Sequence, residues 1–436
     1  MESKKDITLS KKISGDQDAD ATLFGGVLSN HSSRIFEMTQ ARDKDIRFAA
    51  LDLTGHLLRQ GQLNPNEATP FLFALQGDVE EDRIRSLALK LLMTEGEKRP
   101  DMLRQRACAG VKQAYLFQKS IYPEKDEVSA LVDVNRNGRI QKECVLGSVY
   151  RECIQSIKKQ RQGLFRDLLG LFSAERVEEK PVESNGMKSP KKRRSSSQKK
   201  PTVQSMNDLA LLSFAAQVLV HLPFTAAADP LYIIHKITSV LALQGPDLLD
   251  RLACFLRPYG LASSDEMDEN NLTEDAIEVA ARRNTPRHAK EVTRLMEPDF
   301  DTHTFFDLCS GAGSLTLLLR MKEYLKKCYN LSESRCLEYN PDAKEKIHDR
   351  TISKPNASAK FNAYLPLQKD ASELDLDGMI SQYAEFHQRM RIESSFDVRL
   401  EEEESDDDDA PPTPQQQQSP RQAKKRRRSS SGAAHT

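Results

Sequence analysis

The sequence lacks the features that mark membrane and secreted proteins. It has no tryptophan, and aromatic residues make up 6% of its 436 positions. No apolar run reaches the roughly 18 residues that a membrane-spanning helix requires. The first residues, Met1-Glu-Ser-Lys-Lys-Asp, contain no apolar signal core. We therefore expect no membrane association and no secretion.

Cysteine pairs and catalytic motifs are also scarce. The seven cysteines are scattered without a Cys-x-x-Cys pair, which in a chain without a secretion signal indicates reduced intracellular thiols that mostly fill the core. No Gly-rich loop ends in Gly-Lys-Ser or Gly-Lys-Thr, and no Ser-His-Asp arrangement can be assigned from spacing. His56, His221 and His235 lie on helical stretches, and we interpret them as packing or surface groups. The sequence thus predicts a protein that is not an enzyme and that holds no metal or other cofactor.

The composition indicates that a good part of the chain is not packed. Hydrophobic residues make up 38% and charged residues 30% of the sequence, and a low apolar share limits the surface that folding can bury. The formal net charge of −1 hides separate acidic and basic blocks. The separate acidic and basic blocks are more informative than the net charge.

A repeated pattern organises the part that should fold. Asp45-Ile-Arg-Phe-Ala-Ala-Leu returns 38 residues later as Arg83-Ile-Arg-Ser-Leu-Ala-Leu, and small and apolar residues continue at helical spacing in both copies. Such a period is typical of stacked helical hairpins. We expect Arg47 and Arg85 to lie near the surface and to neutralise nearby acids; these are Asp43, Asp45 and Asp82. The alternative interpretation is two unrelated amphipathic helices.

The stretch between the two copies fits a helical hairpin. Asn64 can cap a helix, Pro65 suits its first turn, and Glu67 can complete a capping box. Pro70 removes a backbone donor and should kink that helix. A turn that carries Asp78 then leads to the second copy, so the segment resembles a HEAT repeat, a helical hairpin that stacks into solenoids.

We therefore predict an all-α fold, a HEAT-repeat α-solenoid with disordered insertions and tails, without alternating strand patterns anywhere. Helices are expected at 101–122, 144–157, 164–172 and 208–223, from Asp229 to Leu243, in a short segment opened by Pro246, and at 314–329. The predicted organisation is a disordered N-terminus (1–25), HEAT-like repeats (26–174), a disordered basic insertion (175–206), HEAT-like helices (207–258), a charged insertion (259–302), a C-terminal helical region (303–398) and a disordered acidic then basic tail (399–436).

One stretch imitates a cofactor site. Phe305-Phe-Asp-Leu-Cys-Ser-Gly-Ala-Gly-Ser-Leu resembles the first motif of S-adenosylmethionine-dependent methyltransferases, with Asp307, Gly311 and Gly313 at the turn. Few residues follow before the acidic tail, and no further apolar strand runs appear among them. We therefore favour a loop of small residues that enters an apolar packing helix, and we keep a methyltransferase as the alternative function.

A second stretch imitates a calcium loop. Asp133-Val-Asn-Arg-Asn-Gly-Arg-Ile copies the first eight positions of an EF-hand loop, but position 12 is Cys144 where a bidentate Glu belongs. Arg136 and Arg139 would add positive charge where the ion would lie. The pattern favours a polar turn before a helix.

Two basic clusters suggest nuclear import or contact with nucleic acid. Each is flanked by Ser, Pro or Gln, as exposed nuclear localisation signals usually are. Serines beside the clusters, for example Ser195 to Ser197, could be phosphorylated, which would cancel nearby positive charge. A merely solubilising role is the alternative. The predicted signal residues are Lys191, Lys192, Arg193, Arg194, Lys424, Lys425, Arg426, Arg427 and Arg428.

The order of several short motifs resembles the C-terminal region of the Nipped-B, or adherin, family of cohesin loaders. The motifs are collinear with that region over roughly residues 40–370. They are Asp45 to Leu75, Gln160 to Phe172, Pro223 to His235, the Leu315 to Leu325 helix with Leu331-Ser-Glu-Ser-Arg, and Asp349-Arg350.

The resemblance implies a non-enzymatic chromatin scaffold in the nucleus. Family members bind the SMC heads and the kleisin of cohesin, hold double-stranded DNA against them and stimulate cohesin's ATPase, so the catalysis belongs to cohesin. The family's N-terminal segment, which binds a helper subunit, has no counterpart here, which leaves helper binding in doubt. Importin is expected to carry the chain to the nucleus. The predicted DNA groove includes Lys158, Lys159 and Arg161. A nuclear helical adaptor without DNA contact is a further alternative.

Overall fold

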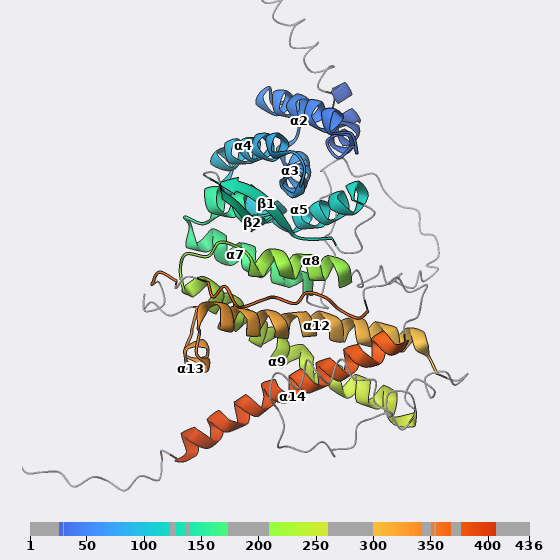
Figure 1. The fold of residues 1–436 in the computed structure, drawn as a ribbon, viewed down its shortest axis with the longest axis vertical. Helices are drawn as coiled ribbons and strands as arrows, with labels where there is room; N and C mark the ends of the chain where they lie inside the picture. Colours follow the sequence, from blue (N-terminus) through green and yellow to red (C-terminus); the bar gives the residue numbers. More distant parts are fainter. Residues whose placement is uncertain are drawn as a thin grey trace, which may run out of the picture. The chain divides into compact units, whose positions relative to one another are not determined.

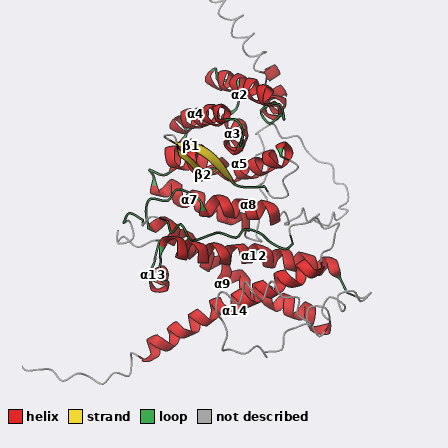
Figure 2. Cartoon of the chain, viewed as in Figure 1, coloured by secondary structure: helices red, strands yellow, loops and turns green. Residues whose placement is uncertain are grey.

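The computed structural model describes residues 26–28, 30–122, 128–136, 139–172, 209–259, 300–341, 350–352, 355–367 and 376–406. Helices dominate this part of the chain, and one two-stranded hairpin is the only sheet within it (Figure 2). The chain divides into two units, 1–390 and 391–436, and the boundary lies within the last helix.

The helices stack in layers, with α12 lying between α8 and α9 (Figure 1). In the first unit α3 packs on α5, α5 packs on α7 and α8, α8 packs on α12, and α12 packs on α9. This is the predicted α-solenoid. The helices are α2 (Lys44–Arg59), α3 (Pro65–Ala74), α4 (Asp82–Lys98), α5 (Pro100–Ile121), α6 (Gly147–Val149), α7 (Lys158–Leu169), α8 (Leu209–Val220), α9 (Ala228–Leu256), α12 (Thr302–Tyr329), α13 (Glu333–Leu337) and α14 (Leu376–Asp406). Short 3-10 turns cover Leu75–Gly77, Gly170–Phe172 and Arg257–Tyr259, and a π-helical turn covers Tyr150–Ile154.

The hairpin predicted from the repeat is present. Asn64 caps α3 by accepting from the backbone N–H of Asn66 at 3.0 Å, and its side-chain amide donates to Glu67 Oε1 at 3.1 Å. The Glu67 carboxylate thus contacts the Asn64 side chain, whereas a capping box would bind the Asn64 backbone N–H. Pro65 occupies the first turn, and Pro70 lies inside the helix.

The two repeat arginines lie at the base of this hairpin. The Arg47 side chain is fully buried, and its Nε donates to Asp78 Oδ2 at 3.0 Å. Arg85 donates to the backbone carbonyl of Asp78 and to the Asp82 carboxylate at 2.9 Å. The predicted Arg85–Asp82 pair is therefore confirmed, but the expected surface position of Arg85 is wrong, because its side chain is buried.

The expected surface position of Arg47 is wrong. Its acidic partner is Asp78, in the turn between α3 and α4, and Arg47 also donates to the carbonyls of Ala41 and Arg42 at 3.0 and 2.7 Å. Asp78 Oδ1 in turn accepts from the N–H groups of Glu80 and Glu81. A buried charge is tolerated when a partner and further hydrogen bonds satisfy it; Asp78 supplies the opposite charge, and the carbonyls of Ala41 and Arg42 supply further acceptors.

The prediction that no strand is present is also wrong. β1 (Leu131–Arg136) and β2 (Arg139–Cys144) pair in antiparallel fashion, from Leu131 opposite Cys144 to Arg136 opposite Arg139. The calcium-loop imitation lies in this hairpin, before a β-strand and not before a helix. The Asp133 backbone carbonyl accepts from Arg85 Nη2 at 3.1 Å, so the hairpin docks against the second repeat arginine.

Two helix boundaries differ from the prediction. α9 continues through Pro246, which was expected to open a separate helix. Buried Leu241, Leu248 and Leu252 hold both halves of α9 in place, so packing outweighs the lost backbone hydrogen bond. The predicted helix at 144–157 begins only at Gly147, because Cys144 belongs to β2.

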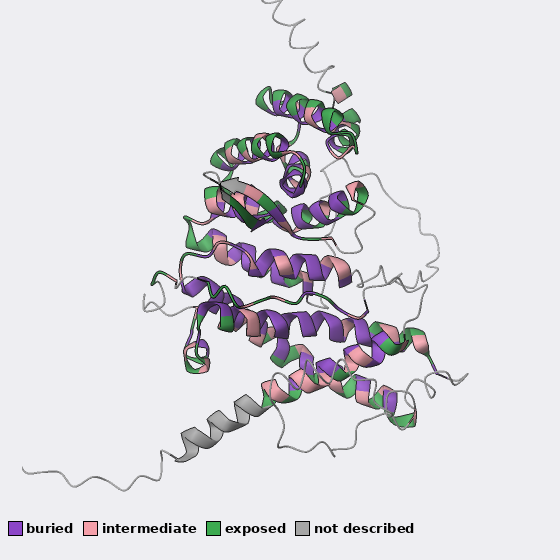
Figure 3. Ribbon diagram, in the orientation of Figure 1, coloured by how far each residue is buried: buried purple, intermediate pink, exposed green. Residues whose placement is uncertain are grey.

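Burial is most complete along α12, where nearly every residue from Ala312 to Lys322 is buried (Figure 3). A helix that is apolar all round requires neighbours on every side. α8, α9, and the first part of α14 provide them. α12 is therefore the central element of the second half of the stack.

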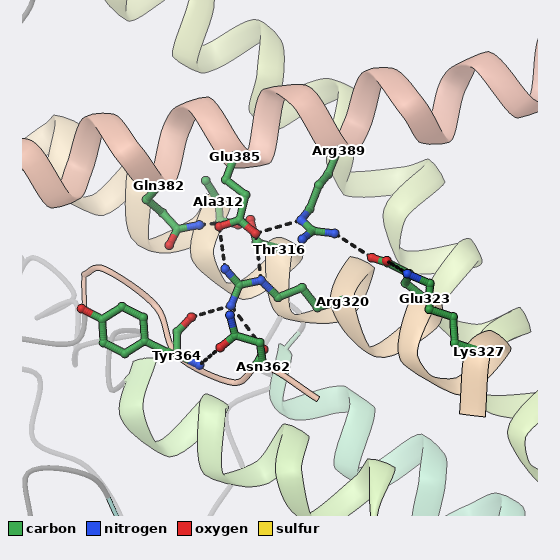
Figure 4. A network of polar contacts seen from close by, with 10 residues as sticks. All are labelled: Ala312, Thr316, Arg320, Glu323, Lys327, Asn362, Tyr364, Gln382, Glu385 and Arg389. Carbon is green, nitrogen blue, oxygen red and sulfur yellow. Dashed lines mark hydrogen bonds and ion pairs between the residues drawn. The ribbon is translucent and has the colours of Figure 1, made fainter. Parts of the chain in front are cut away.

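Charged side chains tie α14 to this buried helix (Figure 4). Arg320 of α12 donates from Nε and Nη2 to the two carboxylate oxygens of Glu385 at 2.8 and 2.6 Å. Arg389 donates to Glu385 at 2.8 Å and to Glu323 at 2.8 Å. Burial raises the pKa of Glu385, but hydrogen bonds and charge from the two arginines outweigh it and hold that pKa below its ordinary value. The carboxylate therefore stays ionised at neutral pH.

Candidate nucleic-acid interface

The residues predicted to carry nuclear import lie outside the described residues. This applies to the cluster Lys191–Arg194, to the cluster Lys424–Arg428 and to the neighbouring Ser195 to Ser197. The segments predicted to be disordered lie outside them as well, except that α14 extends to Asp406, past the predicted start of the tail.

The structure separates the three residues predicted for a DNA groove. Lys158 and Lys159 are exposed in the first turn of α7. Arg161 is mostly buried, its Nε donates to Asp229 Oδ1 at 2.9 Å, and its Nη1 donates to the Gln155 carbonyl at 2.5 Å. Arg161 thus joins α7 to the start of α9, and its assignment to the DNA groove is a misinterpretation of a structural residue.

A different basic surface lies on α5. Arg106, Lys112 and Lys119 are exposed along one side of this helix, with the exposed Leu116 between the two lysines. Among the described residues, no carboxylate is in ion-pair distance of these three side chains. At about 1.5 Å of rise per residue, the stripe is about 20 Å long. We call Arg106, Lys112 and Lys119 the α5 basic stripe.

Packing on the opposite side of α5 fixes which residues face solvent. Gly110 lies directly against Phe73 of α3, where an added Cβ would come within 2.6 Å of the ring. Ala107, Val111 and Ala114 are buried in the same interface. An α-helix makes one turn every 3.6 residues, so burial of one face of α5 leaves the α5 basic stripe on the surface.

Positive charge continues onto the elements beside the α5 basic stripe. Arg42, in the turn before α2, is exposed and donates from Nε to the Ser120 carbonyl at the end of α5. Near the other end of α5, Arg104 pairs with Asp167 of α7 at 2.5 Å, and Arg166 lies 3.6 Å from the same carboxylate. One acid between two arginines leaves a net positive charge there.

The arrangement suits a polyanion. Exposed Lys and Arg side chains bind nucleic-acid phosphates without reading sequence, and their binding is driven by release of counterions. The sole carboxylate of α5, Asp101, accepts from Gln160 at 2.7 Å at the first turn of the helix. The charge asymmetry of α5 is visible in the sequence, and a helical projection of residues 100–121 would have shown it.

The methyltransferase-like residues do not form a turn. Asp307, Gly311 and Gly313 all lie inside α12, which begins at Thr302. A Cβ added at Gly313 would lie 3.3 Å from Leu209 of α8 and 3.5 Å from Leu365, so the glycine serves packing. The favoured loop was therefore wrong in its conformation, although the packing role was correct.

Within the described ranges, no helix is long and apolar enough to cross a membrane. The same residues contain no cluster of three or more His, Cys, Asp or Glu side chains that could hold a metal ion. Burial raises the pKa of the Cys144 thiol, at the calcium loop's twelfth position, to about 12, which keeps it protonated at neutral pH.

Comparison with known proteins gives a consistent result. Residues 24–240 match the family model described as "Sister chromatid cohesion C-terminus". The Nipped-B-like protein scc-2 of Caenorhabditis elegans is 22% identical over 350 residues, which cover 77% of this chain and 14% of the relative. The Nipped-B protein of Drosophila melanogaster is 20% identical over 344 residues, which cover 78% of this chain and 14% of that protein.

A solved structure is also similar. It is the C-terminal fragment of the cohesin loader SCC2 from Chaetomium thermophilum, with a TM-score of 0.49 and 11% identity, and the match covers 86% of this chain and 21% of that one. The chain thus spans a small part of the length of the curated relatives it matches. On the family model and these relatives, the chain belongs to the Nipped-B family of sister chromatid cohesion proteins, in its C-terminal region.

Proposed function

We propose that this chain is a non-enzymatic chromatin scaffold that binds double-stranded DNA and cohesin and helps to load cohesin onto DNA. Family membership supports the role in sister chromatid cohesion. The observation that carries the DNA contact is the α5 basic stripe, three exposed cations without a described acidic partner. In this proposal the chain stimulates cohesin's ATPase by holding DNA near the SMC heads and the kleisin.

The DNA contact is tested by the salt dependence of binding. Each phosphate contact contributes about −0.9 to the slope of log K against log salt. The full chain and the variant Arg106→Gln, Lys112→Gln, Lys119→Gln are titrated with a labelled duplex across a salt series. We expect the variant to bind more weakly, with a slope reduced by about 2 to 3.

A matched control removes the same charge elsewhere. Lys90 is exposed on α4, and Arg251 and Arg257 are exposed at the end of α9. The variant with all three changed to Gln should keep the wild-type slope of log K against log salt. If both triple variants behave alike, net charge alone drives binding and the α5 basic stripe is not the interface. If the wild-type chain binds no DNA, the adaptor without DNA contact replaces the proposal.

The cohesin contact is tested separately. Purified cohesin is assayed for ATP hydrolysis with DNA, with and without the chain. We expect stimulation by the wild-type chain and a smaller effect for the α5 variant, because DNA is then held less firmly. Unchanged hydrolysis with the wild-type chain would count against a loading role for this chain.

Nuclear import is the remaining part of the proposal. The clusters Lys191–Arg194 and Lys424–Arg428 are proposed to bind importin, with phosphorylation at Ser195 to Ser197 weakening that contact. A fluorescent fusion of the whole chain should enter the nucleus, and changing both clusters to Gln should keep it out. Changing the three serines to Asp should lower nuclear accumulation, whereas their change to Ala should not. Nuclear entry without either cluster would reject this assignment.

A further inference from the structure

A pocket of about 540 Å³ lies where segments far apart in the sequence meet. The end of α12, the α13 helix, the start of α9 and residues 350–352 contribute to it. Its apolar lining includes the buried Tyr329 and Leu331, and Ile352. A volume of this size accommodates a side chain and the adjoining backbone of a bound peptide.

Two arginines give the pocket its charge. Arg335 is half-buried on α13, and Arg350 is exposed on the segment opposite. Neither guanidinium has an ion-pair partner among the described residues. Glu338 is the only carboxylate that lines the pocket. The neighbouring acid Glu333 is engaged by Lys326, so two positive charges face one negative charge.

Hydrogen bonds fix the backbone at both arginines. The Ala227 N–H donates to the Arg350 carbonyl at 2.9 Å, and the Ile352 N–H donates to the Thr225 carbonyl at 3.0 Å. On the other side, the Ser332 hydroxyl accepts from the Arg335 N–H at 3.4 Å and caps α13. The pocket is therefore formed before a ligand arrives, and a preformed site loses less entropy on binding.

We propose that this pocket binds a linear acidic peptide of a partner protein, with one apolar side chain on the apolar lining and flanking carboxylates on Arg335 and Arg350. Guanidinium groups bind carboxylates through paired charged hydrogen bonds. A phosphate group makes no favourable contact with an apolar lining. The lining therefore favours a peptide over the backbone of a nucleic acid. The proposal does not depend on the α5 basic stripe.

The acidic run of this chain is a poorer occupant than a partner peptide. Residues 401–409 read Glu-Glu-Glu-Glu-Ser-Asp-Asp-Asp-Asp and contain no apolar residue. The run can supply charge to the two arginines, but it has no side chain for the apolar lining. Its affinity as a free peptide therefore measures the charge contribution alone.

The test uses the full chain and labelled heptapeptides in fluorescence anisotropy. The probe Gly-Glu-Glu-Phe-Glu-Glu-Gly, with Leu, Ile and Tyr in place of Phe as further probes, is compared with a form that carries Gln for Glu and a form that carries Ala for Phe. We expect one or more acidic probes to bind, the Gln form to bind about tenfold more weakly or worse, and the Ala form to be weakened as well. The peptide of residues 401–409 should resemble the Ala form.

Variants connect this binding to the pocket. Arg335→Gln with Arg350→Gln should weaken the best probe about tenfold or more, whereas Arg251→Gln with Arg257→Gln, at and just after the end of α9, should not. Glu338→Gln should strengthen binding because it removes the only lining carboxylate, and a gain of affinity cannot result from loss of folding. The α5 triple variant should bind the peptide normally.

Three results would overturn the proposal. They are no difference between acidic probes and their Gln forms, equal binding of the Phe and Ala forms, and a Glu338→Gln variant that does not bind more tightly. Displacement of the probe by a short DNA duplex, with equal affinity for the Ala form, would assign the arginines to phosphate contacts and would also reject the peptide site. A failure of DNA binding in the α5 experiment leaves these readouts unchanged, so the two proposals fail independently.

Discussion

At the scale of single residues, the N-terminal layers depend on the ion pair between Arg47 and Asp78. Both side chains are fully buried, and their charges are 3.0 Å apart. Loss of one partner leaves an uncompensated charge in the interior. We expect Asp78→Asn and Arg47→Met each to lower the free energy of unfolding by about 3 to 5 kcal/mol. Denaturant titration followed by circular dichroism measures this change.

A double variant distinguishes the ion pair from simple packing. Arg47→Met combined with Asp78→Leu removes both charges, so it should cost less than the sum of the single changes. Lys44→Gln, which disrupts an exposed pair with Glu81, should leave the midpoint unchanged. Strict additivity of the two buried changes would show that the charges do not depend on each other.

His221 gives the stability a dependence on pH. Burial lowers the pKa of this histidine, although its contact with the Gln217 carbonyl opposes the shift. The unfolded chain therefore binds a proton at a higher pH than the folded chain does. This histidine's contribution is present above the usual histidine pKa of about 6.5 and is lost as the pH falls below that value.

We expect His221→Phe to flatten the loss of stability between about pH 6.5 and 5. Phe keeps an aromatic ring beside Tyr324 and Phe361, whose ring centroids lie 5.8 and 6.4 Å from that of His221. Denaturant midpoints across this pH range give the slope, and His56→Gln, at an exposed position, is the matched control. If the Phe variant keeps the wild-type slope of stability against pH, His221 is not the source of that slope.

At the scale of elements, two glycines of helices should respond in opposite ways to alanine. In α5, a Cβ at Gly110 would lie 2.6 to 2.7 Å from three Phe73 atoms, including Phe73 Cβ. Gly110→Ala should therefore destabilise the fold by about 1 to 3 kcal/mol through strain. In α12, a Cβ at Gly311 would make an ordinary contact of 3.5 Å with Leu248.

Gly311→Ala should therefore leave the stability unchanged or raise it by up to about 1 kcal/mol, because alanine is the better helix former. Thermal or denaturant unfolding of both variants provides the comparison. Marked destabilisation by Gly311→Ala, with Gly110→Ala tolerated, would show that the helix packing described for α5 and α12 is incorrect.

Helical period and capping residues predicted most of the elements, because those signals are local. Asn64, Pro65 and the spacing of small residues in α5 are sufficient to place α3 and α5. The β-hairpin was missed although Asn137-Gly138 is a strong turn signal between alternating residues. The same residues also copy the first positions of a calcium loop, and that pattern favoured a polar turn.

Long-range contacts could not be predicted from such signals. Arg47 and Arg161 both looked like surface cations, and their partners Asp78 and Asp229 lie 31 and 68 residues away. Whether a cation is free or paired depends on the stacking of helices. The sequence therefore grouped Arg161 with the exposed Lys158 and Lys159, although Arg161 is paired with Asp229.

At the scale of the whole first unit, contacts connect mainly neighbouring layers. α2 packs on α4, and α12 packs on α8 and α9. In such a stack, the stability of each layer depends on itself and its neighbours, so a local change need not spread along the solenoid.

We therefore expect Asp78→Asn to increase hydrogen exchange in α2, α3 and α4 while the amides of α12 keep their protection. The reason is that Asp78 contacts the first layers, whereas α12 is enclosed by α8, α9 and α14. Exchange measured by mass spectrometry on the intact chain resolves these segments. Glu385→Gln provides the reciprocal case, because it removes the carboxylate that the buried Arg320 shares with the half-buried Arg389. This variant should expose α12 and the first part of α14 and leave α2 to α4 protected. Equal loss of protection in every helix for both variants would show that the first unit opens as one cooperative block.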